Sequence, residues 1–219
     1  MINVVELVDT KRLSGNYFAP SAYVRCDLEL GLLENRQGER LLALPDNFLQ
    51  GIYAGLEAET GQAARLVLFN CGRWWGKNFY GRFCEEIVEY YNKPLEDMMM
   101  VEFLQCFRQC WNTLGWGDIE LNRDYYNHGF LEVKLWNSAF AESAPAWKRP
   151  VCFLEAGILK AFFCNLTNQD LHCVQIACES LGAECNRFLL GLPERLKPAE
   201  AWVEEGVAAE DIMARLLDR

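Results

Sequence analysis

The chain has 219 residues, a net charge of −10 and a hydrophobic fraction of 51%. This length supports one large domain, or one domain with extensions, around a sizeable core. The acidic balance and the lack of a basic stripe argue against nucleic-acid binding, because phosphate contacts need clustered lysine and arginine. The sequence has no apolar run of roughly 18 residues and no signal-peptide pattern at its start, so we expect a cytoplasmic protein.

The first half of the chain predicts extended segments followed by three helices. Asp46 is a suitable N-cap for the first helix, and Pro94 opens the third. The second helix repeats apolar residues at three- and four-residue steps, which makes one apolar face. In chain order we expect an extended segment, a strand or turn, and the three helices at residues 23–33, 40–44, 47–59, 62–91 and 95–113.

The second half predicts two hairpins with helices between and after them. Residues 127–129 (Asn-His-Gly) mark the first turn, Gly182 marks the second, and Pro193 and Pro198 mark a linker. The expected elements are strands 118–126 and 130–136, a helix at 151–166, a hairpin within 171–190, and closing helices at 200–205 and 208–217. This order predicts an α+β domain in which antiparallel hairpins pack against helices on one face.

Aromatic residues, 13% of the chain, suggest a ligand pocket. Gly72 and Gly76 lie four apart on the aromatic face of the long helix, so another backbone can come close to it. Such a surplus can line a pocket for a flat or apolar ligand, or it can form core or an oligomer interface. The candidate pocket residues are Phe69, Trp75, Phe79, Phe83, Tyr126, His128, Phe130 and Trp136.

Three of the ten cysteines are candidate metal ligands. Cys178 and Cys185 bracket the turn at Gly182, where their sulfurs could converge, and Cys152 lies at the start of the preceding helix. Zinc takes about four nitrogen, sulfur or oxygen ligands on a tetrahedron, and these cysteines would supply three. The alternative is three packed thiols, since free cysteines are often buried as small hydrophobic residues.

The sequence contains none of the common nucleotide, hydrolase or metalloprotease motifs (GxGxxG, GxxxxGK[ST], GxSxG and HExxH). Only two histidines are present, which limits general-base chemistry. We therefore expect no nucleotide cofactor, and the sequence favours a non-catalytic protein over an enzyme.

Two segments carry a resemblance to a known family. The helix CFLEAGILKAFF, the turn CESLGAEC and the following Phe188 resemble the closing half of the 4-vinyl-reductase domain family. Upstream, FNCGRWWGKNF at residues 69–79 resembles the glycine-arginine helix of that family. The resemblance divides the chain into an N-terminal extension at 1–41, the domain at 42–192 and a C-terminal helical tail at 193–219.

The resemblance implies the fold of the vesicle-tethering transport-particle subunits, a homodimer formed through helices, and a pocket for a small hydrophobic ligand such as a tetrapyrrole or a lipid-like tail. It also implies zinc at Cys152, Cys178 and Cys185. Gln175 stands at the family's fourth ligand position, which is a glutamate, and the turn is one residue shorter.

Stand-alone members from photosynthetic bacteria suggest an accessory factor in photosystem or chlorophyll-protein assembly, with a membrane-protein partner and thylakoid association. The alternatives are a reductase of a vinyl group on a chlorophyll precursor, and a ligand sensor that acts through a separate partner.

Overall fold

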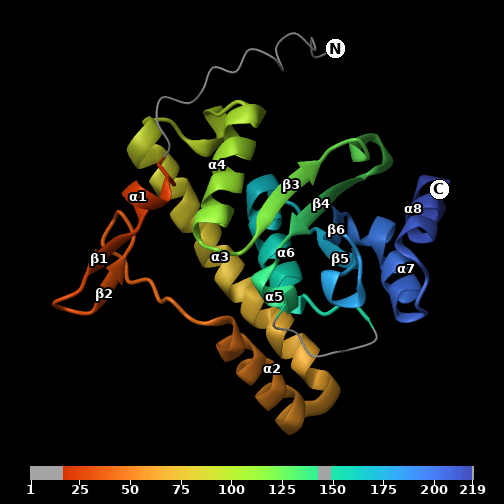
Figure 1. The fold of residues 1–219 in the computed structure, drawn as a ribbon. Helices are drawn as coiled ribbons and strands as arrows, with labels where there is room; N and C mark the ends of the chain where they lie inside the picture. Colours follow the sequence, from red (N-terminus) through yellow and green to blue (C-terminus); the bar gives the residue numbers. More distant parts are fainter. Residues whose placement is uncertain (1–16, 143–148, 219) are drawn as a thin grey trace. The chain divides into compact units, whose positions relative to one another are not determined.

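A computed structural model describes residues 17–142 and 149–218 (Figure 1). The described chain forms two compact units. The first contains residues 17–43 and 83–114, and the second contains residues 44–82 and 115–218. The predicted domain limits at 41/42 and 192/193 stay a prediction.

The first unit is a small aromatic core with one hairpin. Its elements are α1 (Pro20–Tyr23), the antiparallel strands β1 (Arg25–Asp27) and β2 (Leu32–Glu34), residues 83–91 of α3 (Ala64–Tyr91), the 3₁₀ turn η3 (Leu95–Asp97) and α4 (Met100–Thr113). The Phe83 ring stacks on Phe18 with centroids 5.6 Å apart. The helix expected at 95–113 is interrupted because Met98 and Met99 are extended, with ψ of 142° and 148°.

The second unit is built on a four-stranded antiparallel sheet of order β3-β4-β6-β5. Its strands are β3 (Asp118–Asn122), β4 (Phe130–Trp136), β5 (His172–Ala177) and β6 (Asn186–Gly191). The two predicted hairpins, β3–β4 and β5–β6, join where β4 pairs with β6. The predicted α+β class with antiparallel hairpins is therefore confirmed.

The remaining elements of the second unit are helices and short turns. Among them, α6 directly precedes β5 in the chain. The elements are α2 (Asp46–Thr60), η2 (Gly61–Ala63), residues 64–82 of α3, η4 (Tyr126–His128), α5 (Ala139–Glu142), α6 (Phe153–Thr167), η5 (Glu179–Leu181), α7 (Pro193–Glu204) and α8 (Ala209–Leu217).

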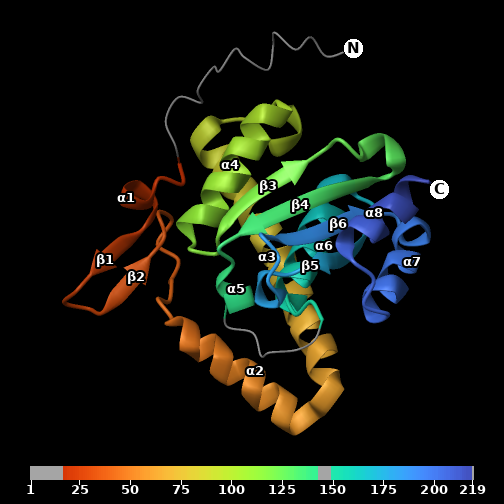
Figure 2. The same ribbon diagram turned by 45° about the vertical axis from the view of Figure 1, so that its right-hand side comes forward.

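Helices cover both faces of this sheet instead of the one face expected (Figure 2). Val174 and Leu189 pair across β5 and β6 and pack against α7 and α8. Their strand neighbours Gln175 and Phe188 pair on the opposite face, where Gln175 contacts the start of α6. Side chains alternate between the two faces of a strand, and both faces are covered here. Most residues of β5 and β6 are therefore buried.

The linker expected at Pro193 and Pro198 is wrong, because both prolines lie in α7. Pro193 stands in the first turn, where its missing N–H would have no intrahelical partner. Pro198 lies inside the helix, between the fully buried Leu196 and Ala199. Packing of these two side chains on the sheet holds the helix together through the proline.

The close backbone approach predicted for Gly72 and Gly76 is confirmed, and the partner is α6. A side chain added at Gly72 would overlap the Leu154 carbonyl, and one added at Gly76 would overlap that of Ile158. Gly157 of α6 faces α3 in the same way, against the Phe69 carbonyl. The backbones of α3 and α6 are therefore in direct contact at Gly72, Gly76 and Gly157.

Candidate functional site

The predicted aromatic pocket residues lie in several different places in the structure. The Trp75 and Phe79 rings are stacked; Trp75 packs against Trp116, and Phe79 packs against Phe162. Phe69, earlier on α3, is half-buried. Phe83 belongs to the core of the first unit. These side chains are packing residues, which is the alternative that the sequence left open.

The other four predicted pocket residues are on β4 and the turn before it. Phe130 stacks on Tyr125 in the core beneath α7 and α8. Tyr126 and His128 are exposed in η4. Trp136 alone among the eight lines a groove of the second unit. The eight residues therefore do not form one pocket.

This groove has a volume of about 740 Å³. Its walls are the end of β4, the β5–β6 turn and the segment 203–210, which joins α7 to α8. The apolar lining includes Trp136, Ile176, Cys178, Leu181, Val203 and Val207. Charged side chains, Lys134, Arg149, Glu184, Arg187 and Glu210, border the same space. A ligand with both an apolar body and a polar group would match this lining.

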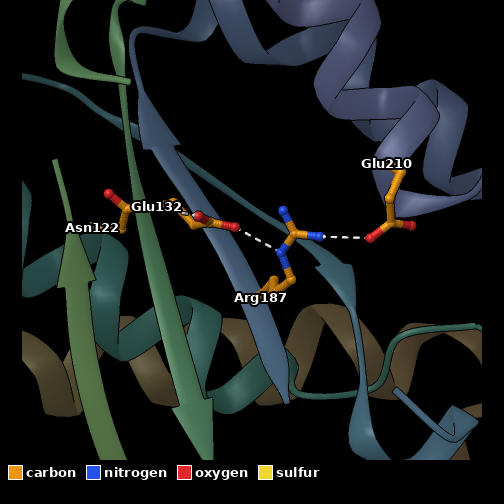
Figure 3. Close-up of polar contacts among 4 residues, drawn as sticks. All are labelled: Asn122, Glu132, Arg187 and Glu210. Carbon is orange, nitrogen blue, oxygen red and sulfur yellow. Dashed lines mark hydrogen bonds and ion pairs between the residues drawn. The ribbon is translucent and has the colours of Figure 1, made fainter. Parts of the chain in front are cut away.

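Arg187 fixes one wall of the groove to the sheet (Figure 3). Its Nε donates a hydrogen bond of 2.6 Å to Glu132 Oε1, and its Nη1 lies 3.0 Å from Glu210 Oε1 on α8. Glu132 is only 1% exposed, and Asn122 donates to its second oxygen. The buried carboxylate is thus paired and hydrogen-bonded, as burial of a charge requires.

A second feature beside the groove is a close pair of cysteines, Cys152 and Cys178. Their Sγ atoms are 3.8 Å apart, and each residue is 1% exposed. Ser180 Oγ lies 3.0 Å from Cys178 Sγ. The hydrogen bond with Cys152 lowers the pKa of Cys178 to about 6, against the opposing effect of burial. Burial raises the pKa of the Cys152 thiol well above its usual value.

A buried carboxyl group and a phenol lie close to this pair. Glu155 is fully buried on α6, and Ser138 Oγ donates to its Oε1 at 2.8 Å. Glu155 Oε2 and the Tyr53 hydroxyl have no hydrogen-bond partner among the described residues. Burial raises the pKa of Glu155 to about 8 and raises that of Tyr53, with Glu155 a further cause for Tyr53. The sequence analysis did not predict a role for either residue; the signal for Glu155 was a carboxyl group in the apolar first turns of α6.

Gln175 and Asn186 join the cysteine pair in a buried network. Gln175 Oε1 accepts from the Cys152 backbone N–H at 2.9 Å, and its Nε2 donates to the Ala177 carbonyl and to Asn186 Oδ1. Asn186 Oδ1 also lies 3.7 Å from Cys152 Sγ. The Gln175 side chain is therefore engaged through both its oxygen and its nitrogen.

Cys185 does not join the other two predicted zinc ligands. Its charged neighbours are Lys134, Arg187 and Glu184, and no contact links it to Cys152 or Cys178. Successive residues of an extended chain point to opposite sides, so an Asn186 that faces Cys152 sends Cys185 away. The structure thus assembles two cysteines of the predicted set of three.

The residues present do not make a zinc site. A sulfur separation of about 3.8 Å suits two ligands of a tetrahedral zinc with Zn–S bonds of about 2.3 Å. The third and fourth ligands are missing, because Cys185 points elsewhere and Gln175 is a hydrogen-bonded amide. Across the described residues, no group of three histidine, cysteine, aspartate or glutamate side chains is arranged to hold a metal ion.

The cysteine pair and part of the groove lie in a segment that matches a known family. Residues 131–192, from β4 to the end of β6, match the family model of the V4R domain. The 4-vinyl-reductase resemblance expected from the sequence is confirmed over this segment. No curated protein matches the chain.

Among solved structures, the chain is similar to the phenol-responsive sensory domain of the transcription activator PoxR, crystallised with phenol. The TM-score is 0.64 at 14% identity, over 83% of this chain and 90% of that one. The two chains therefore share a fold.

Two further structures have TM-scores of 0.47. One is a vinyl-4-reductase family protein from Methanocaldococcus jannaschii, with 16% identity over 68% of this chain and 82% of that one. The other is a trafficking protein particle complex subunit 3 from Naegleria fowleri covalently bound to palmitic acid, with 8% identity over 67% and 94%.

In the part of the chain that the structure describes, no helix has the length and apolarity needed to cross a membrane.

Proposed function

We propose that this protein is a non-catalytic binding module that holds a small, mainly apolar ligand in the groove beside Trp136. The observation that carries the proposal is the groove itself. Its volume of about 740 Å³ falls within the usual range for small-molecule sites, roughly 300–1,000 Å³. An aromatic ring and aliphatic side chains supply the apolar wall, and Lys134 supplies a cation that can orient a hydroxyl or carboxylate group.

The fold supports the same proposal. The PoxR sensory domain responds to phenol, a flat ring with a single polar group, and this chain shares its fold. A ring of this kind would pack against Trp136 and Ile176 with its hydroxyl toward the charged border of the groove. The function would then be ligand sensing or ligand carriage, passed on through a partner protein. A narrower role in photosystem or chlorophyll-protein assembly has its basis in the sequence resemblance alone.

The test is calorimetric titration of the full chain with phenol and with benzoate. Ala208 lines the groove and is exposed, so Ala208→Trp places a large ring in the ligand space. Ala201→Trp is the matched control, because Ala201 is exposed on α7 and does not line the groove. We expect the wild type and Ala201→Trp to bind alike and Ala208→Trp to lose at least tenfold in affinity. Equal binding by all three proteins would place the site elsewhere.

We also propose that the module forms the homodimer implied by the resemblance. α2 and the start of α3 present exposed apolar side chains, with Phe48 50%, Ile52 40% and Leu66 63% exposed. Exposed apolar side chains on two consecutive helices are candidates for an interaction site. The double variant Phe48→Glu/Leu66→Glu should convert a dimer to a monomer in light scattering, whereas Trp74→Glu, at an exposed position farther along α3, should not. A monomeric wild type would refute the proposal.

A further inference from the structure

Cys152 and Cys178 form a close pair of buried thiols. Their two Sγ atoms are 3.8 Å apart, and neither residue is part of a disulfide. Both residues lie at the ends of elements, Cys152 as the N-cap of α6 and Cys178 as the N-cap of η5. Rotation about the Cα–Cβ bonds of the two residues would change the distance between the sulfurs without moving the backbone.

The surroundings of the pair disagree with the zinc role that the resemblance assigns to it. Asn186, not Cys185, faces Cys152, and Gln175 is held by hydrogen bonds to the Cys152 N–H and to Asn186. These contacts fill the position of the missing ligands with neutral amides. What remains is two thiols in contact, with a serine hydroxyl 3.0 Å from Cys178 Sγ.

We infer that Cys152 and Cys178 are a dithiol that a peroxide closes reversibly to a disulfide. A peroxide is small enough for a pair whose residues are each 1% exposed, and Cys178 borders the groove through which it would arrive. Closure requires the sulfurs to move from 3.8 Å to the disulfide bond length of about 2.05 Å. Rotation of the two side chains at the element ends supplies this movement.

The reaction has two steps, and Cys178 reacts first because it lines the groove. Cys178 Sγ attacks one oxygen of the hydroperoxide, the O–O bond breaks, and an alcohol leaves with the thiol proton, so that Cys178 becomes a sulfenic acid. Cys152 Sγ then attacks Cys178 Sγ, the S–O bond breaks, and water leaves with the Cys152 proton. Two thiols and one hydroperoxide give one disulfide, one alcohol and one water, and hydrogen peroxide gives two waters. Two equivalents of an external thiol restore the dithiol and leave as their own disulfide.

The test is oxidation of the full chain by hydrogen peroxide, followed by blocking of free thiols, digestion and mass spectrometry. We expect the peptides that contain Cys152 and Cys178 to be linked, with a loss of two hydrogen atoms that a thiol reductant restores. Cys152→Ser should stop at a sulfenic acid on Cys178, which dimedone traps, and Cys178→Ser should form no link at Cys152. Cys185→Ser is the matched control, since Cys185 borders the same groove without touching the pair, and should behave as the wild type.

Two results would overturn the inference. One is a free Cys152–Cys178 pair after the exposed Cys26 and Cys71 have been oxidised. The other is one equivalent of zinc per chain, measured by elemental analysis of protein purified without chelator, with Cys152 and Cys178 protected from alkylation until the zinc is removed. Neither result depends on phenol binding, so this inference and the proposed function fail separately.

Discussion

Gln175 Oε1 accepts a hydrogen bond of 2.9 Å from the backbone N–H of Cys152, which ties the middle of β5 to the first residue before α6. The same side chain continues through its amide nitrogen to Asn186 on β6. One residue thus connects two strands and a helix in the buried part of the sheet. The amide does so without charge, where a carboxylate would carry one.

Replacing Gln175 by alanine should destabilise the fold. The change leaves the Cys152 N–H without its partner in a buried site, and such a loss costs about 1–3 kcal/mol, whereas Asn186 Oδ1 still accepts from the Glu179 N–H. Urea denaturation should show this loss in the free energy of unfolding. Gln169→Ala, at an exposed position just after α6, should stay close to the wild type. A stable Gln175→Ala would mean that water replaces the amide.

Glu155 should make stability fall as pH rises. Its pKa is about 8 in the fold against 4.5 ordinarily, so between these values the unfolded chain releases a proton that the folded chain keeps. The contribution is complete below about pH 4.5 and is lost through about pH 8, by an amount on the order of a few kcal/mol.

Glu155→Gln should remove this part of the pH dependence, which unfolding measurements at about pH 5 and about pH 9 would reveal. Glu120→Gln, at an exposed position on β3, is the control and should retain the wild-type slope. Identical slopes in all three proteins would show that Glu155 is ionised in the fold.

The glycine contact between α3 and α6 should tolerate no side chain. Gly72→Ala or Gly157→Ala forces the two backbones apart, and overpacking of this kind costs about 1–3 kcal/mol or more. Gly81→Ala, on the same α3, meets open space and should be neutral or stabilise by about 0.5–1 kcal/mol through helix propensity. Thermal unfolding of the three variants decides the matter. Similar losses at Gly72 and Gly81 would contradict the backbone contact.

Removing Arg187 should be far more harmful than removing its exposed partner. Arg187→Met leaves the Glu132 carboxylate buried and unpaired, at a cost of about 3–5 kcal/mol. Glu210→Gln breaks the ion pair between Arg187 and the Glu210 side chain. Because Glu210 is 81% exposed, this loss costs about 0–1 kcal/mol. The double variant Glu132→Gln/Arg187→Met should recover much of the stability in urea denaturation. Failure to recover would mean that Arg187 acts mainly through packing.

Local sequence signals predicted much of the fold. Alternating apolar residues and the glycine at 182, which has a φ of +86°, located β5, β6 and the turn between them. The first half of α7 was predicted as a linker because two prolines outweigh a weak apolar pattern, and burial of Leu196 and Ala199 on the sheet stabilises it. Local propensity therefore failed where tertiary contacts supply the stability.

The candidate site was predictable only in part. The sequence predicted a set of three cysteines, with Cys178 and Cys185 around Gly182 and Cys152 at the start of the preceding helix, and the structure brings Cys152 and Cys178 together. Whether Cys185 or Asn186 faces Cys152 depends on the register at which β6 begins after the turn. A shift of one position would exchange the sides to which residues 185 and 186 point. The Tyr53–Glu155 proximity joins residues about a hundred positions apart, so no local pattern indicates it.

Val174, Ile176 and Leu189 form a sheet face that α7 and α8 cover. Both helices lie outside the residues that match the family model. A fragment limited to residues 131–192 would contain three strands and α6. It would expose this apolar face to water, and exposed apolar patches promote aggregation. The segment that matches the family model is therefore shorter than the segment needed for a fragment that stays folded and does not aggregate. Fragment boundaries chosen from sequence families alone would cut away the cover of the sheet.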